Sequence, residues 1–133
     1  MKNLIIFLAT TLFAEIYITN GKINTFDFST QQKNIKCFNA LSPFDNKIHK
    51  YCGIKLKNFV NLSCNSPKKV EFIAFDDYHV EFNPKEINDN TIFLVNSDNG
   101  KKIIPKIVYS KQNYPKTYIY KKSIFLIKKA ICK

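Results

Sequence analysis

The sequence predicts a single α+β domain that is rich in β-strands and has one or two short helices. The chain has 133 residues and 45% apolar content, which is enough for one globular domain with a real hydrophobic core. Only 3 glycines and 5 prolines interrupt it, while isoleucine, valine, phenylalanine and tyrosine recur throughout, a composition typical of strands. We therefore expect one domain, residues 15–133.

Residues 1–14 have the features of a secretory signal peptide. Lys2 gives a positive start, and an apolar run follows from Leu4 to Phe13. As a helix this run would cover only roughly half of the bilayer core, which is short for a membrane anchor. We expect cleavage near Ala14, export to the periplasm or the exterior, and no stable membrane insertion afterwards. The alternative is a retained amphipathic N-terminal tether.

The mature chain is expected to open with a hairpin. Apolar residues alternate from Ile16 to Ile23 around Asn20 and Gly21, a pair that accepts the positive φ angles of a type I′ turn. Residues 29–39 have a weaker pattern, which fits a short helix or a loop.

A short helix is expected next. After a Ser-Pro turn at 42–43 the chain is extended, and it then turns at Gly53. The apolar positions that follow suit one buried face of a helix. They are Ile54, Leu56, Phe59, Val60 and Leu62.

The centre of the sequence predicts a second hairpin. A strand from Val70 to Phe75 has apolar residues on both faces, which favours a central, doubly covered position. Asp76 and Asp77 then form a structural turn, in which carboxylates accept backbone N–H groups. In the returning strand, Tyr78, Val80 and Phe82 face one way and His79 and Glu81 the other.

The C-terminal part continues with extended segments. Pro84 ends the pairing, and residues 85–89 suit a single helical turn. A strand from Thr91 to Val95 leads into a turn cluster at 96–100, which ends with Gly100.

Three further strands complete the expected fold. The first extends from Lys101 to Tyr109, and Pro105 interrupts its ladder of hydrogen bonds. After a loop, short strands are expected at Tyr118 to Tyr120 and at Ser123 to Ile131.

The strong positive charge does not predict nucleic-acid binding. All 21 basic residues are lysine, against 10 acidic residues, which gives a formal net charge of +11. Arginine, whose planar fork is the preferred device for phosphate and base recognition, is absent. The lysines are also dispersed in pairs between apolar segments. We expect a solvated rim and no nucleic-acid partner, with weak contact to an anionic surface as the alternative.

Four cysteines are expected to form disulfides in an exported protein. Cys37, Cys52, Cys64 and Cys132 allow three pairings, and the sequence does not choose among them. There is no C-x-x-C and no cluster of cysteine with histidine. Zinc binding and dithiol redox chemistry are therefore not expected.

The polar residues do not predict a catalytic site. Asp76 and Asp77 are neighbours, and adjacent side chains on a strand point to opposite faces, so they are poorly placed to share a proton. His79 and Glu81 do share a face, but His49 is the only other histidine and no ligand spacing supports a metal, so surface positions are expected. No nucleophile elbow, P-loop or Rossmann glycine pattern is present.

Five segments, taken in order, resemble the oxidoreductase molybdopterin-binding domain of the sulfite oxidase type, particularly its short exported bacterial members. The segments are GIKLKNFV (53–60), VEFIAFDDYHVEFNPKEI (70–87), IFLVNSDNGKKI (92–103), PKIVY (105–109) and YKKSIFLIKKAI (120–131). The resemblance covers roughly residues 50–131. It implies an α+β fold dominated by mixed sheet, with Gly53, Asp76, Asp77, Tyr78 and Gly100 as structural motif positions.

The chain departs from this family where the cofactor would bind. It has no tryptophan to open the last strand and no arginine to hold a pterin phosphate. Family members ligate molybdenum with a cysteine thiolate, and Cys37 and Cys52 are the candidates here, with Cys37 in the more suitable region. We therefore expect a relative without cofactor rather than an enzyme.

The expected function is a binding module of the cell envelope. Its ligand would be an envelope protein partner or a small anion, held by lysines and backbone amides around Gly53 and the turn from Asp76 to Tyr78. One alternative is a molybdopterin-dependent oxidoreductase with Cys37 as metal ligand, acting on a small oxyanion or sulfoxide. The second alternative is a small, secreted, basic disulfide protein unrelated to this family.

Overall fold

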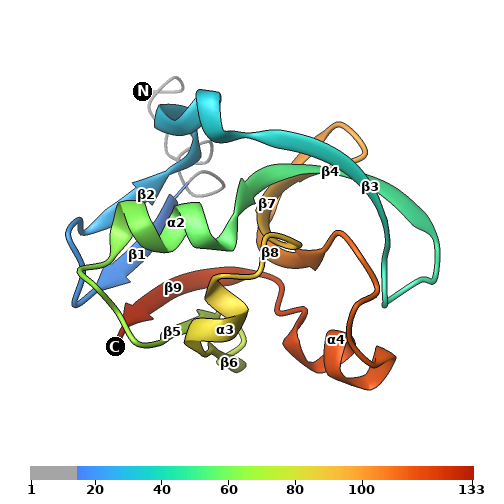
Figure 1. Ribbon diagram of the computed structural model, residues 1–133. Helices are drawn as coiled ribbons and strands as arrows, with labels where there is room; N and C mark the ends of the chain where they lie inside the picture. Colours follow the sequence, from blue (N-terminus) through green and yellow to red (C-terminus); the bar gives the residue numbers. More distant parts are fainter. Residues whose placement is uncertain (1–14) are drawn as a thin grey trace.

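The computed structural model describes residues 15–133, which form one small domain built mostly of β-sheet with a few short helices (Figure 1). The predicted α+β class is confirmed at this level. The predicted signal peptide, residues 1–14, lies outside the described residues. Between residues 15 and 133, no helix is long and apolar enough to cross a membrane.

One sheet has five strands in the order β2-β1-β9-β5-β6. It is mixed, because β1 runs parallel to β9 while the other neighbours are antiparallel. The first and last strands therefore lie side by side, and this sheet forms only when both ends of the domain meet (Figure 1). The strands are β1 (Glu15–Thr19), β2 (Thr25–Asp27), β5 (Val70–Ala74), β6 (His79–Phe82) and β9 (Ile127–Cys132).

The other sheet has four antiparallel strands in the order β3-β4-β7-β8, so β3 and β8 are its edges. Its strands are β3 (Lys36–Leu41), β4 (Ile48–Lys55), β7 (Ile92–Asp98) and β8 (Lys101–Tyr109). The helices are η1 (Phe28–Asn34), α2 (Leu56–Ser63), α3 (Pro84–Ile87) and α4 (Lys116–Lys122).

The main core packs α2 against the five-stranded sheet and includes buried side chains of β4, β7 and β8 from the other sheet. Phe59 of α2 is fully buried, and its ring centroid is 4.9 Å from that of Phe26 in β2 and 5.6 Å from that of Phe72 in β5. Burying one such ring stabilises the fold by about 2–3 kcal/mol. The predicted amphipathic helix is confirmed, although Ile54 belongs to β4 and Leu62 is partly exposed.

The opening hairpin is confirmed, but its turn is not type I′. Ile16 of β1 lies opposite Phe26 of β2, and the connection between the two strands is longer than two residues. Asn20 has a φ of 62°, whereas Gly21 does not have positive φ. Gly21 is needed for a close approach instead, because a Cβ there would lie 2.2 Å from the carbonyl oxygen of Ser63.

Gly53 does not form the expected turn. It lies inside β4, where the register with β7 shifts between Cys52 and Gly53. A Cβ at this position would lie 2.2 Å from the carbonyl oxygen of Leu94. The glycine therefore allows β4 and β7 to pack together at an irregular point of the sheet.

The central hairpin is confirmed with two corrections. Val80 and Phe82 are buried while His79 and Glu81 face outward, as predicted. Tyr78 is half exposed rather than buried with them, because it precedes β6 and donates its hydroxyl to the carbonyl oxygen of Lys121 at 2.8 Å. β5 buries alternate residues only, so the expected double coverage of this strand is wrong.

α3 is the predicted single helical turn after Pro84. Asn83 caps it, because its side-chain oxygen accepts the N–H of Glu86 at 2.9 Å. The Glu86 carboxylate accepts the N–H of Asn83 in return, which completes a capping box.

The turn between β7 and β8 is tighter than the predicted cluster. β7 continues to Asp98, and Asn99 and Gly100 form the turn with φ angles of 49° and 82°. Positive φ at both central residues fits a type I′ hairpin.

Residues 116–122 form a helix where we expected a strand at Tyr118 to Tyr120. Pro115 precedes the first turn of α4, Ile119 is buried, and two lysines lie at the negative end of the helix dipole. β9 begins at Ile127 rather than at Ser123. The local preference of tyrosine and isoleucine for strands is overridden by the burial of one helix face.

One disulfide joins two neighbouring strands, and the other joins segments that are 68 residues apart in the sequence. Cys37 and Cys52 are directly opposite each other in β3 and β4, and their sulfurs are bonded. Cys64, after α2, is bonded to Cys132 in the last strand, and both are buried. The predicted use of all four cysteines in disulfides is confirmed.

Candidate functional site

Five large apolar side chains gather on one part of the surface, which we call the aromatic surface. They are Phe44, Tyr78, Tyr120, Phe125 and Leu126. The Phe44 ring centroid lies 5.4 Å from that of Tyr120 and 5.2 Å from that of Phe125. These three rings nevertheless stay 44% to 57% exposed. Single exposed apolar residues are ordinary, whereas a contiguous cluster marks an interaction site.

Four hollows share side chains of the aromatic surface. One, of about 490 Å³, shares only Tyr78 and lies beside β6, and the other three are lined by Phe44, Tyr120 or Phe125. The helix pocket has a volume of about 340 Å³, the central pocket about 210 Å³ and the strand groove about 560 Å³. Tyr120 lines both the helix pocket and the central pocket. Phe44 and Phe125 line both the central pocket and the strand groove. The three hollows are therefore neighbours that share aromatic side chains as walls.

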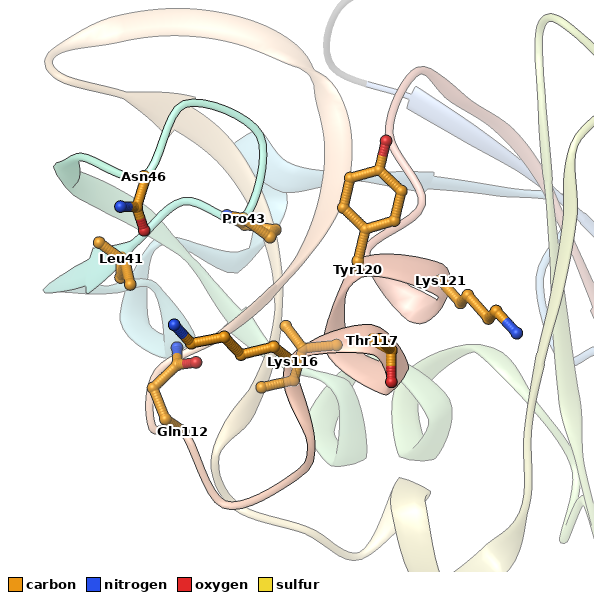
Figure 2. A pocket seen from close by; sticks show the side chains of 9 residues that line it. Leu41, Pro43, Asn46, Gln112, Lys116, Thr117, Tyr120 and Lys121 are labelled. Atoms are coloured by element: carbon orange, nitrogen blue, oxygen red, sulfur yellow. The ribbon is translucent and has the colours of Figure 1, made fainter.

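The helix pocket lies between the β3–β4 loop and α4. Figure 2 shows Leu41, Pro43 and Asn46 on the loop side and Lys116 reaching across from α4 toward them. Thr117, Tyr120 and Lys121 of α4 also line the pocket. The volume is within the lower range of ligand-binding cavities, which start at about 300 Å³.

The strand groove runs beside β8, the edge of the four-stranded sheet. Ile103 and Ile104 contribute its apolar surface on β8, and Phe44, Phe125 and Leu126 come from other segments. The charged residues that line it are Asp98, Lys102 and Lys106.

Hydrogen bonds within the β3–β4 loop hold Phe44 in place. Ser42 is buried, and its N–H donates to the carbonyl oxygen of Lys47 at 2.8 Å. Its hydroxyl oxygen accepts the N–H of Phe44 at 3.3 Å, and its carbonyl oxygen accepts the N–H of Asn46 at 3.0 Å. These bonds hold the backbone of the loop that carries Phe44.

His49 connects this loop to β7. Its Nδ1 lies 2.7 Å from Asp98 Oδ1, and its Nε2 lies 2.7 Å from Asp45 Oδ2. The hydrogen bond to Asp98, and then that to Asp45, raise the pKa of His49 above its ordinary value. Protonated His49 can donate to both carboxylates, so it links the loop to the sheet.

Lys106 places a half-buried ammonium group at the strand groove. Its Nζ lies 3.9 Å from Asp98 Oδ2, 4.9 Å from the ring centroid of Tyr51 and 5.9 Å from that of Phe44. Burial lowers the pKa of Lys106. A cation that is partly removed from water interacts more strongly with an added carboxylate than a solvated lysine does.

The predicted site residues are only partly brought together. Asp76 and Tyr78 line the central pocket, and Asp76 Oδ1 accepts the N–H of Tyr78 at 3.2 Å, as expected of a structural turn. Gly53 is buried against Leu94 and does not line any of these hollows within residues 15–133. Gly100 lies in the β7–β8 turn with open space around its Cα.

The described residues do not fit a molybdenum cofactor at Cys37. The Cys37 sulfur is bonded to that of Cys52 at 2.01 Å, so it offers no thiolate to a metal while the bridge is intact. The chain also contains no arginine to hold a phosphorylated pterin.

His79 and Glu81 point outward but pair with different residues. His79 lies 3.2 Å from Glu71 and 3.3 Å from Asp77, whereas Glu81 lies 3.1 Å from Lys133. Among the described residues, no group of three or more His, Cys, Asp or Glu side chains is arranged to hold a metal ion.

Sequence reasoning missed most of the aromatic surface. Phe44 stands in a loop after the Ser-Pro pair, and Tyr120 was assigned to a strand. The available signal was the presence of phenylalanine and tyrosine in segments with no clear apolar period. That signal does not show that the β3–β4 loop, α4 and the segment before β9 meet on one part of the surface.

Comparison with known proteins adds no relative to this description. No protein-family model matches the chain, and no curated protein matches it.

Proposed function

We propose that this protein is an exported binding module that holds an envelope protein partner on the aromatic surface. Its scaffold would be that of the molybdopterin-binding domain, used without the cofactor. The observation that carries the proposal is the contact of Phe44, Tyr120 and Phe125 with one another while each ring stays about half exposed. Exposed aromatic residues beside hollows are the usual anchors of protein interfaces.

The disulfides support an exported role, and the positive charge supports a partner with acidic groups. Two disulfides form and persist in oxidising compartments such as the periplasm or the exterior. A partner with acidic groups next to its apolar anchors would complement Lys106 and Lys102 beside Phe44 and Phe125.

Site-specific crosslinking in intact producing cells tests this function. A photoreactive phenylalanine analogue replaces Phe125 in one variant, Phe44 in a second and Tyr17 in a third. Tyr17 is a matched control, because it is also half exposed but does not line the three hollows. We expect a discrete covalent adduct with one protein from positions 125 and 44 and none from position 17.

A second substitution checks that the adduct reports specific binding. Phe125→Ser should reduce the adduct formed from position 44 by at least about tenfold, because truncating an aromatic hot spot costs about 2 kcal/mol or more of binding free energy. Equal labelling from all three positions, or an adduct that is unchanged by Phe125→Ser, would rule out the aromatic surface as the binding site.

Metal analysis addresses the alternative enzyme function. Stoichiometric molybdenum in protein purified from the exported fraction, lost in Cys37→Ser, would replace the binding module with an oxidoreductase. That result would also require the Cys37–Cys52 bridge to be open in the cell.

A further inference from the structure

The outer edge of β8 is only partly used by the domain itself. β7 pairs with one side of β8, with a register shift between Val95 and Ser97 that sets residues 103–105 of β8 opposite one residue of β7, and β8 is the last strand of its sheet. On the outer side, the N–H of Ile107 donates to the carbonyl oxygen of Ile124 at 2.8 Å. Within residues 15–133, no backbone hydrogen bond reaches the outer edge of β8 between Lys101 and Lys106. Such an edge is a template for another extended chain.

The segment before β9 begins to pair with β8 and then leaves it. After the bond at Ile124, Leu126 adopts a left-handed conformation with φ of 56°, and β9 starts in the other sheet at Ile127. This conformation is costly for a branched residue such as leucine and is a feature of functional or tightly constrained sites. Leu126 is 37% exposed and lines the strand groove beside β8.

The strand groove combines apolar and positively charged side chains beside the edge of the sheet. Lys102, Ile103, Ile104 and Lys106 of β8 line it together with Phe44, Phe125 and Leu126. Strand addition uses backbone hydrogen bonds for affinity and pockets for alternate side chains for specificity. Pro105 lacks an N–H, a feature tolerated at the edge of a sheet.

The positive charge around the strand groove favours the binding of an acidic peptide. Lys101 and Lys102 are exposed at one end, and the side chain of Lys106, further along β8, is only 14% exposed. Asp98, the acidic residue of the groove, is already engaged by His49 at 2.7 Å and by Lys106 at 3.9 Å. The exposed ammonium groups of Lys101 and Lys102 would attract carboxylates, and Lys106, which faces Asp98 at 3.9 Å, adds to the positive charge of the groove. They also disfavour a second copy of this chain, because paired β8 edges would bring like charges together.

We propose that the strand groove binds an acidic peptide segment in extended conformation, which adds to the outer edge of β8 as a further strand. The proposal rests on the proposed function, since it identifies the part of the partner that the aromatic surface would hold. Phe44 and Phe125 would contact alternate side chains of the added strand, and Lys102 and Lys106 would contact its carboxylates.

Selection from a random peptide library tests the chemistry of the occupant. A displayed library of random eight-residue peptides is selected against the exported protein. We expect enrichment of acidic peptides with apolar residues at alternate positions. Enrichment of basic or neutral sequences, or no enrichment, would overturn the proposal.

Backbone methylation tests the mode of binding. The best enriched peptide is synthesised with N-methyl groups at its even or at its odd positions. We expect one series to lose at least about tenfold in affinity and the other to change by less than about threefold, because alternate residues of a strand face the edge. Equal effects in both series would overturn strand addition, yet binding that still depends on Phe125 would leave the proposed function intact.

Charge variants and oligomeric state complete the test. Lys102→Glu should weaken the enriched peptide by at least about tenfold, whereas Lys128→Glu, the same charge change on the five-stranded sheet, should have an effect below about threefold. Equal weakening by both variants would indicate nonspecific attraction and overturn the proposal. A concentration-dependent dimer in sedimentation that Lys102→Glu strengthens would show that a second copy occupies the edge, and would overturn it too.

Discussion

His49 joins the β3–β4 loop to β7 through both of its ring nitrogens. The loop carries Phe44, so the position of this ring depends on the bonds of His49 to Asp45 and Asp98. The same Asp98 also approaches Lys106 in the strand groove. His49 therefore affects the β3–β4 loop that carries Phe44, and through Asp98 it also affects the charge of the strand groove.

We expect the stability of the protein to fall as pH rises above the ordinary pKa of histidine. The pKa of His49 is raised in the folded state, so its contribution is complete below the unfolded value of 6.5 and is lost as pH rises through the folded value. Between about pH 6 and pH 9 the wild type should lose about 1 kcal/mol of unfolding free energy that His49→Gln does not lose. Urea unfolding at both pH values measures the difference.

His79→Gln is the control for this prediction. The pKa of His79 is also raised, first by its hydrogen bond to Glu71, but its side chain is exposed and lies on the other sheet. Its removal should therefore leave most of the pH dependence in place. An unchanged pH dependence in His49→Gln would show that His49 does not hold the loop.

At the scale of elements, Gly53 allows β4 to pack closely against β7. Gly53 lies where β4 packs irregularly against β7, with Leu94 and Val95 at backbone distances that leave no room for a Cβ. The sequence marked this glycine as important but suggested a turn. Its role depends on the opposite strand, which is distant in the sequence.

Gly53→Ala should therefore destabilise the domain by about 3 kcal/mol, because the added methyl group overlaps backbone atoms that have little freedom to move. Gly100→Ala is the matched control. Its φ of 82° would cost about 1 kcal/mol, but the space around it is open. Chemical denaturation of both variants should show the larger loss in Gly53→Ala, and the reverse order would contradict the close packing of β4 on β7.

α4 shows where element prediction from the sequence is limited. Tyr118, Ile119 and Tyr120 all favour strands, and the local pattern is too short to separate period 2 from period 3.6. The helix buries Ile119 and leaves Tyr120 in the aromatic surface. By contrast, the turns at Asp76–Asp77 and Asn99–Gly100 were found, because their signals lie within a few residues.

At the scale of the molecule, the Cys64–Cys132 disulfide fixes the end of α2 to the last strand. It spans 68 residues, whereas Cys37–Cys52 spans 15 and crosses two neighbouring strands. The five-stranded sheet depends on β9 lying between β1 and β5, so the longer bridge secures the strand that joins both ends of the domain.

Replacing both Cys64 and Cys132 by alanine should lower stability more than replacing Cys37 and Cys52. Loop entropy alone accounts for about 4 kcal/mol for the long bridge and about 3 kcal/mol for the short one, and the long bridge is also buried. Thermal unfolding of the two double variants measures this order. A lower melting temperature for the Cys37 and Cys52 variant would contradict it.

The sequence by itself determined the strand-rich α+β class, the amphipathic helix, two of the turns and the use of all four cysteines. These features depend on composition, on short-range periodicity and on residues with special backbone preferences. The pairing of the cysteines, the two-sheet arrangement and the aromatic surface were decided only by the tertiary structure. The physical reason is that each requires contacts between segments far apart in the chain, such as Phe44 with Tyr120 and Phe125, and no local pattern specifies them.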